Sequence, residues 1–321
     1  MDIHGRTVLI LGGSGLVGLA VARRLLRHEP RSLVLTALTR DEAEDAVREL
    51  REEGEVPAGT DLVAEWGDLF LPEAVKDRSR ASVLADAEVR GHLLDDLYGQ
   101  LTAETVERSA LGALVLRHRP DIVVDCVNTA TVLAYQNLFE SAMALRREAH
   151  GDGVSAEAVE RHLAMLYLPQ LIRHVQIALE AMRRAETGIY LKIGTAGSGG
   201  MGLNIPFTHS EERPSRTLLA KSGLAGAHTL FLFLMARTPG GPAVKEIKPT
   251  AAISWKRIGF GEVRKRGRPI ERFDAVRAVS LGEAFGEDLK GVYQSAGGAL
   301  EGVYLDAGEN GMFSLGEFEA L

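Results

Sequence analysis

Three glycines near the N-terminus constrain the fold of this chain more than any other feature. The short apolar run Thr7–Leu11 ends directly at Gly12, and Gly15 and Gly18 follow at intervals of three residues. Helical spacing of apolar residues begins at Leu19. A strand that turns this abruptly into a helix needs one glycine for the tight turn and another where helix and strand pack closely. The sequence therefore predicts a strand–turn–helix unit at the start of an α/β domain.

Five further apolar runs predict the rest of the sheet. They alternate with helical segments, and they lie at 33–38, 62–66, 121–127, 188–193 and 243–247. Strands and helices in regular succession imply right-handed crossovers and a parallel sheet with helices on both faces. We therefore expect an α/β fold, a Rossmann-type doubly wound parallel sheet, over residues 1–250. The loop-rich, basic segment 251–321 is expected to form a small C-terminal substrate lobe.

Two stretches are longer than a minimal sheet of this kind requires. Residues 70–118 are charged and mostly helical, and residues 131–150 have the pattern of an additional helix. The longest helical stretch begins near Ser155 and runs to about Arg184, with a kink expected at Pro169 because proline interrupts the helical hydrogen bonds.

Capping boxes mark two expected helix starts. The first is Thr39–Glu42, directly after the second strand, and the second is Ser314–Glu317 near the C-terminus. Leu300–Leu305 has the pattern of a strand. A helix as short as the last one needs docked apolar residues to be stable, so we expect Phe318 to pack against the protein.

The composition excludes several classes of protein. The chain has 321 residues and a net charge of −7, which argues against extensive nucleic-acid binding. Its single cysteine, Cys126, allows neither a disulfide framework nor a cysteine-based zinc site, and a reducing, cytoplasmic location is the simplest expectation. The nine histidines contain no HExxH pattern, so no metal is expected. No apolar run approaches the roughly 20 residues that span a bilayer, so no membrane partner is expected.

The glycine turn has the pattern of a dinucleotide site. A glycine at position 15 lets the backbone approach a pyrophosphate, and the N–H groups at the start of the following helix face its charge. Ser14, Leu16 and Val17 would line the site together with the glycines. The alternative is a glycine turn that serves the fold alone.

This spacing resembles the short-chain dehydrogenase/reductase superfamily, and its extended, epimerase/dehydratase-like branch in particular, over roughly residues 5–255. Gly67-Asp68-Leu69, Asp125–Ala130, Ile193–Gly197 and Lys248-Pro249-Thr250 follow in the order of that family's ligand loops. The resemblance implies a nicotinamide dinucleotide cofactor. Its binding residues would be Gly12, Ser14, Gly15, Leu16, Val17, Gly18, Asp68, Leu69, Val127, Asn128, Thr129, Lys221, Pro249 and Thr250.

The catalytic residues implied by the resemblance include one departure. The family's Tyr-x-x-x-Lys pair reads Thr217-x-x-x-Lys221 in this chain, so the lysine is present and the tyrosine is replaced. Thr195 falls where the family places a serine or threonine that binds the substrate oxygen. A threonine hydroxyl cannot match the acidity of a phenol beside a lysine. Thr217 is therefore a weak candidate for the proton carrier, and Tyr135 and Tyr167 are other candidates on helices after the fourth strand.

Arg40 bears on the choice of cofactor. NAD-binding proteins usually carry an acidic residue at the end of the second strand, but Thr36, Ala37 and Leu38 end this one. An arginine just beyond the strand can pair with a 2′-phosphate. NADP is therefore the expected cofactor, and NAD is the alternative. In that alternative, Arg40 is a solvated arginine at the start of a helix.

The activity and partners remain open among a few alternatives. The leading one is an NAD(P)-dependent oxidoreductase, or a redox-neutral relative, acting on a carbonyl or hydroxyl carbon of a small molecule. A sugar-nucleotide dehydratase or epimerase is a narrower version, and a dinucleotide-binding sensor or scaffold without catalysis is the rival. The resemblance also implies a homodimer, formed by helices near 131–149 and 156–184, and the alternative is that their apolar residues all belong to the core. These residues are Leu133, Leu138, Phe139, Met143, Leu163, Leu166, Leu171 and Ile172.

Basic residues in the C-terminal segment allow two interpretations. They form either a solvated face or a site for an anionic substrate, and nucleic acid is less favoured because the rest of the chain is acidic. The residues are Lys256, Arg257, Arg264, Lys265, Arg266, Arg268 and Arg272.

Overall fold

The computed structural model describes two compact units of the chain. One unit comprises Met1–Ser198 with Arg213–Pro249, and the other comprises Gly199–Glu212 with Thr250–Leu321. The residues described are 2–136, 138–151, 153–193, 216–247, 257–262, 264–265, 268–278, 280, 293–306 and 312–314.

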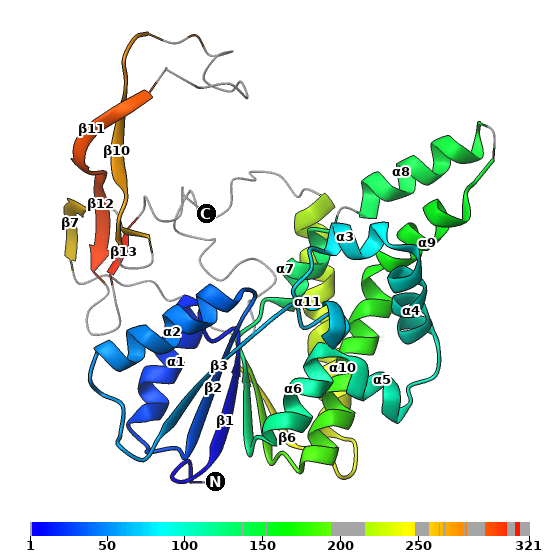
Figure 1. The fold of residues 1–321 in the computed structure, drawn as a ribbon, viewed down its shortest axis with the longest axis horizontal. Helices are drawn as coiled ribbons and strands as arrows, with labels where there is room; N and C mark the ends of the chain where they lie inside the picture. Colours follow the sequence, from blue (N-terminus) through cyan, green and yellow to red (C-terminus); the bar gives the residue numbers. More distant parts are fainter. Residues whose placement is uncertain are drawn as a thin grey trace. The chain divides into compact units, whose positions relative to one another are not determined.

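The first unit is built on a six-stranded parallel sheet (Figure 1). Its spatial order is β3-β2-β1-β4-β5-β6, with every neighbouring pair parallel. The strands are β1 (Thr7–Leu11), β2 (Ser32–Ala37), β3 (Asp61–Trp66), β4 (Ile122–Asp125), β5 (Ile189–Ile193) and β6 (Ala243–Ile247). This order is that of a doubly wound dinucleotide-binding sheet, and the strand order reverses between β1 and β4. The α/β Rossmann-type fold expected from the sequence is confirmed.

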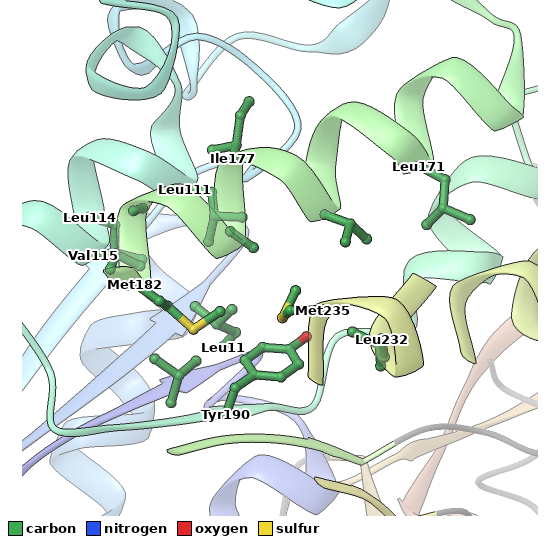
Figure 2. Packing of buried hydrophobic residues seen from close by; sticks show 14 of the residues in the cluster. Leu11, Leu111, Leu114, Val115, Leu171, Ile177, Met182, Tyr190, Leu232 and Met235 are labelled. Atoms are coloured by element: carbon green, nitrogen blue, oxygen red, sulfur yellow. The ribbon is translucent and has the colours of Figure 1, made fainter. Parts of the chain in front are cut away.

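Helices cover both faces of the sheet because alternate residues of the buried strands point to opposite sides. Val8 and Ile10 belong to the core under α1 (Leu16–Leu26) and α2 (Arg40–Glu52). Leu9 and Leu11 belong to the core on the other face, with Tyr190 and Met182. Figure 2 shows this second core. The helices that supply it are α6 (Ala110–His118), α7 (Thr129–Ala134), α10 (Tyr167–Ala185) and α11 (Arg216–Ala236).

The charged stretch 70–118 forms a group of short helices between β3 and α6, as expected. They are the 3₁₀ helix η1 (Glu73–Val75), α3 (Arg80–Ala85), α4 (Ala87–Tyr98) and α5 (Ala103–Arg108). α3, α4 and α5 are capped by Ser79, Asp86 and Thr102, whose side chains each accept a backbone N–H three residues on. A third, smaller core of Leu71, Val83, Leu84, Leu93 and Ala164 lies beneath them.

The prediction of one kinked helix from Ser155 to Arg184 was wrong. The chain instead forms α9 (Ala156–Ala164) and α10, and the break falls at Met165 and Leu166. Pro169 is the third residue of α10, where a missing N–H costs no helical hydrogen bond. The expected helix at 131–150 is likewise two helices, α7 and α8 (Leu138–Ala149).

Helix α11 is unusually apolar. Its window Leu219–Ala236 has a mean hydropathy of 1.3, and 28% of that window is buried. By length and composition alone it could cross a membrane. In this fold it packs against α7, α10 and β6, which is the position of a helix that covers a sheet.

The described part of the second unit consists of short antiparallel strands. They are β7 (Arg257–Glu262), β8 (Arg264–Lys265), β9 (Arg268–Pro269), β10 (Glu271–Ala275), β11 (Tyr293–Ala299), β12 (Glu301–Asp306) and β13 (Met312–Ser314). The strand expected at Leu300–Leu305 is therefore confirmed as β12. Most of the seven basic residues lie on β7 to β10, and Arg272 pairs with Asp274 at 3.4 Å. Lys256, Arg266 and the expected helix with Phe318 fall outside the described residues.

Candidate functional site

The glycine turn lies between β1 and α1, next to the point where the strand order reverses. Gly12 has φ +72°, a conformation that favours glycine, and its N–H donates to Oγ1 of Thr36 on β2 at 2.9 Å. A Cβ at Gly18 would lie 2.2 Å from the carbonyl oxygen of Gly12, so only glycine fits there. Among the described residues, a Cβ at Gly15 would meet only that same oxygen, at an ordinary 3.5 Å. The fold itself therefore requires Gly12 and Gly18 but not Gly15.

Gly13 is a further required glycine that the triplet pattern does not include. A Cβ at this position would lie 2.8 Å from Cβ of Leu35 on β2. The consecutive glycines Gly12-Gly13 could have predicted this, because a single tight turn needs only the first of the two.

The N-terminus of α1 is open to an anion. Seven other helices of this unit (α2 to α7 and α9) begin at a residue whose side chain accepts a backbone N–H, but α1 begins after Gly15 and has no acidic residue in its first turn. Leu16 and Val17 are 74% and 51% exposed. Within the described part of the chain no side chain caps the first N–H groups of this helix, and phosphate binding by them stays a prediction.

An aromatic and basic group lies at the ends of β2 and β3. The Arg40 guanidinium is 5.1 Å from the centre of the Trp66 ring, and the Lys76 ammonium is 5.9 Å from it. Arg40 is exposed and pairs with Glu44 at 2.7 Å. Asp68 accepts the N–H of Phe70 at 2.9 Å, so one of its oxygens stabilises the turn. Leu69, beside it, is half-buried and packs against the core.

The residues after β4 form the opposite side of the candidate site. Asn128 caps α7 by accepting the N–H of Thr131 at 3.1 Å. Val127 lies beside Gly12, with its Cγ2 atom 3.4 Å from the position of a Cβ there. Thr129 is 1% exposed, and its hydroxyl oxygen has no hydrogen-bond partner within the described part of the chain.

A buried ion pair holds this segment, and the sequence analysis did not identify it. The Lys192 ammonium lies 2.9 Å from the Asp125 carboxylate, and the two side chains are 4% and 1% exposed. Lys192 also donates to the carbonyl of Val127 at 2.5 Å, while Asp125 accepts the N–H of Val127 at 2.9 Å and the hydroxyl of Tyr190 at 2.6 Å. The sequence feature that could have predicted this pair is a single lysine within an apolar strand. In the sheet, Lys192 lies directly opposite Asp125. Both polar groups of the Val127 backbone are therefore fixed by this pair.

The buried charges affect the protonation of their neighbours. Burial would raise the pKa of Asp125, but the Lys192 charge and the two hydrogen-bond donors outweigh it and hold that pKa below its usual value. His174 on α10 stacks on Phe70 with ring centres 4.5 Å apart. Burial lowers its pKa to about 4, so the imidazole is neutral at pH 7.

We expect His174 to make the stability of the protein depend on pH. The unfolded histidine, with a pKa near 6.5, takes up a proton before the folded one, so stability present above pH 6.5 is lost as the pH falls toward 4. Between pH 7 and pH 5 this amounts to roughly 2 kcal/mol. His174→Gln should reduce the pH dependence of urea unfolding by that amount. If His174→Gln loses as much stability between pH 7 and pH 5 as the unmodified protein does, His174 is not the cause. His150→Gln, at an exposed position, is the control.

The residues in the positions of the family's catalytic pair lie on α11. Thr217 and Lys221 are one helical turn apart on the same face, and both are half-buried. Burial lowers the pKa of Lys221 from its ordinary value. Among the residues that the structure describes, Lys221 has no recorded hydrogen bond or ion pair, and its role as a cofactor ligand stays a prediction. Thr195, Pro249 and Thr250 fall outside the described residues.

The two candidate tyrosines differ in their surroundings. Tyr135 follows α7 and is 69% exposed. The hydroxyl of Tyr167 donates to the carbonyl of Ala134 at 3.1 Å and accepts the N–H of Leu138 at 3.4 Å, so it joins α10 to the α7–α8 connection. Among the described residues, no cluster of three or more His, Cys, Asp or Glu side chains could hold a metal ion.

Comparisons with known proteins find similar structures but no similar sequence. No protein-family model matches the chain, and no curated protein matches it. Similar solved structures include Pen from Bacillus thuringiensis, a short chain dehydrogenase from Burkholderia cenocepacia J2315 in complex with NADP, and the Bordetella bronchiseptica enzyme WbmG in complex with NAD and UDP. Their identities to this chain are 11%, 16% and 13%, and their TM-scores are 0.37, 0.36 and 0.34.

In the same order, the aligned regions cover 77%, 77% and 76% of this chain. They cover 51%, 75% and 53% of the three solved structures. The chain thus covers about half the length of the first and third. At such scores the likeness adds nothing to the strand order and glycine turn described above.

Proposed function

We propose that this chain binds a nicotinamide dinucleotide at the carboxyl edge of its sheet and acts as an oxidoreductase, or a redox-neutral relative, on a carbonyl or hydroxyl carbon. The observation that carries the proposal is Gly15. The described residues leave space for a side chain at this position, and α1, whose start no side chain among them caps, begins directly after it. A glycine at this position is explained if a ligand approaches the backbone closely. In this type of turn that ligand is a pyrophosphate.

Different residues around the turn would bind different parts of the cofactor. The N–H groups of Leu16 and Val17 would hold the pyrophosphate, and Arg40 would pair with a 2′-phosphate. Lys221 would donate to the hydroxyls of the nicotinamide ribose, with Thr195 hydrogen-bonded to the substrate oxygen. When bound, the nicotinamide supplies or accepts a hydride. The ion pair under Val127 would keep the backbone beside it in one conformation.

Thr217 favours a second candidate, a dinucleotide-binding protein without catalysis. The hydroxyl in the position of the family's proton carrier is far less acidic than a phenol, whereas Lys221 is retained. An NADPH-consumption assay distinguishes the enzyme from the binding protein without catalysis. It follows the absorbance of NADPH with a panel of aldehydes, ketones and sugar nucleotides. Turnover that Lys221→Met abolishes supports an enzyme. Tight NADPH binding without turnover of any substrate supports the sensor or scaffold, and absence of NADPH and NADH binding refutes both.

The cofactor preference should depend on Arg40. We expect NADPH to bind more tightly than NADH, and Arg40→Ala to remove most of that difference by weakening NADPH binding roughly tenfold or more, the usual effect of losing a charge-assisted hydrogen bond. Titration calorimetry measures both affinities. Arg48→Ala, which removes an exposed arginine of the same helix, is the control. Equal affinities for NADPH and NADH in the unmodified protein would refute the prediction.

We also propose a homodimer formed by helices of the first unit. Of the apolar residues expected at the interface, Leu133 and Leu171 are fully buried in the core, but Phe139, Met143 and Ile172 are 39%, 50% and 39% exposed. Exposed apolar side chains on helices such as α8 and α10 are typical of surfaces that another chain covers. Light scattering at micromolar concentration should give twice the chain mass, and a monomeric mass would refute the proposal.

A further inference from the structure

The helices inserted between β3 and α6 line a pocket, partly open to solvent, that the proposed function does not use. Its volume is about 60 Å³, and it lies between this inserted segment and α10. Most of its wall is apolar and includes Phe70, Leu93, Leu111 and Ile177. Two arginines also line it, one from each side: Arg80 from α3 and Arg173 from α10.

Arg173 is buried with part of its guanidinium unpaired. The residue is 9% exposed. Its Nε and Nη2 atoms donate to the carbonyl of Leu97 at 3.4 and 3.3 Å, and Nη2 also donates to the carbonyl of Gly99. Its Nη1 atom is shielded from solvent and has no hydrogen-bond partner among the residues described.

Arg80 repeats this arrangement. Its Nη2 atom donates to the carbonyl of Ala164 at 3.2 Å and to Oε1 of Gln170 at 2.6 Å. Its Nε and Nη1 atoms are shielded from solvent, and the described part of the chain offers them no partner. Gln170 and Arg173 are one turn apart on α10, so both guanidinium groups belong to the same small region.

The two positive charges have no direct counter-charge. The carboxylates that act on them are those of Asp68 for Arg80 and Asp96 for Arg173, but within the described ranges neither forms an ion pair with its arginine. Asp96 is instead paired with Arg108, its Oδ2 accepting from Nε at 3.1 Å. Buried charges are normally paired, and an unpaired buried N–H is normally hydrogen-bonded. Asp96 lines the cavity too, but its partner there is Arg108, so the shielded N–H groups of Arg80 and Arg173 leave the cavity suited to an anion.

We propose that this cavity binds a small carboxylate. A volume of about 60 Å³ corresponds to roughly four or five water-sized groups, the size of acetate or propionate. A carboxylate oxygen is the natural partner of a guanidinium N–H, and the apolar wall suits a short aliphatic chain better than the oxygens of phosphate. Trapped waters would satisfy the N–H groups but would not balance the charge. The cavity shares only Leu69 with the candidate dinucleotide site, so the carboxylate is a second ligand.

Calorimetry and thermal unfolding of the full chain, with sodium propionate as the probe, test the proposal. Propionate should bind saturably and at least tenfold more tightly than neutral propionamide, which has the same shape. Arg173→Met and Arg80→Met should each lose this preference, whereas Arg183→Met, at an exposed arginine of α10 that pairs with Glu180, should keep it. The comparison of propionate with propionamide needs no variant, so it decides the matter even if Arg173→Met does not fold.

Several outcomes would overturn the proposal. Equal binding of propionate and propionamide, or no binding of propionate, would leave only water in the cavity. Tighter binding of inorganic phosphate would exclude a carboxylate as the ligand. Displacement of propionate by saturating NADPH would assign the ligand to the dinucleotide site instead. Retention of the preference in both arginine variants would place the binding elsewhere.

Discussion

Replacing Lys192 by methionine should lower the free energy of unfolding by about 3–5 kcal/mol, because it leaves the Asp125 carboxylate buried without its counter-charge. Asp125 is 1% exposed, so water cannot replace the ammonium. For a domain of this size the loss corresponds to a fall in Tm of about 6–20 °C. Thermal unfolding followed by circular dichroism measures it.

A double-mutant cycle identifies the ion pair as the cause. Asp125→Asn should also destabilise the protein, and Asp125→Asn with Lys192→Met should cost less than the sum of the two single changes. Lys245→Met, at an exposed lysine on the neighbouring strand β6, is the matched control and should leave Tm nearly unchanged. A shift of under about 1 kcal/mol for Lys192→Met, the range of exposed ion pairs, would show that water reaches the pair.

The same pair connects the stability of the sheet to the candidate site. Lys192 and Asp125 bind the carbonyl and the N–H of Val127, the residue beside Gly12. Because they act on Val127 through these backbone hydrogen bonds, we expect both to be positioning residues. If the dinucleotide proposal is correct, a conservative Lys192→Arg variant should weaken NADPH binding more than it lowers Tm.

The sheet could be predicted from the sequence because its signals are local. Each strand is a short apolar run, and β1 and β6 have the predicted bounds of Thr7–Leu11 and Ala243–Ile247. The first capping box is also confirmed, since Thr39 accepts the N–H of Glu42. These patterns depend on residues within one turn or one strand, so no tertiary contact was needed to find them.

Two features that escaped prediction depend on contacts between distant segments. Lys192 is 67 residues from Asp125 in the sequence, and only their register across β4 and β5 makes them a pair. The need for Gly13 comes from Leu35 on a different strand. The break before α10 was misplaced for a local reason: Pro169 is unfavourable inside a helix but is tolerated in a first turn. A proline therefore marks the neighbourhood of a break but not its exact position.

Alanine at Gly15 and alanine at Gly18 should differ in their effect on the stability of the fold. Gly15 has φ −76° and ψ 164°, which any residue adopts, and its Cβ would meet nothing closer than 3.5 Å. Gly15→Ala should therefore change the free energy of unfolding by less than about 1 kcal/mol, and it could even be stabilising because alanine restricts the unfolded chain. Gly18→Ala places a methyl group 2.2 Å from the Gly12 carbonyl oxygen and should cost about 1–3 kcal/mol.

Binding should respond differently from stability. Gly15→Ala should weaken NADPH binding roughly tenfold or more, because the methyl group keeps the pyrophosphate from the N–H groups of α1 and removes charge-assisted hydrogen bonds. Gly18→Ala should weaken binding as well, but only together with a fall in Tm, because it displaces the turn itself. Calorimetry with NADPH and thermal unfolding of the same samples measure both quantities. Unchanged NADPH affinity in Gly15→Ala would mean that no ligand approaches this backbone. The glycine that the fold does not need would then have no explanation in dinucleotide binding, and the proposed function would lose its main support.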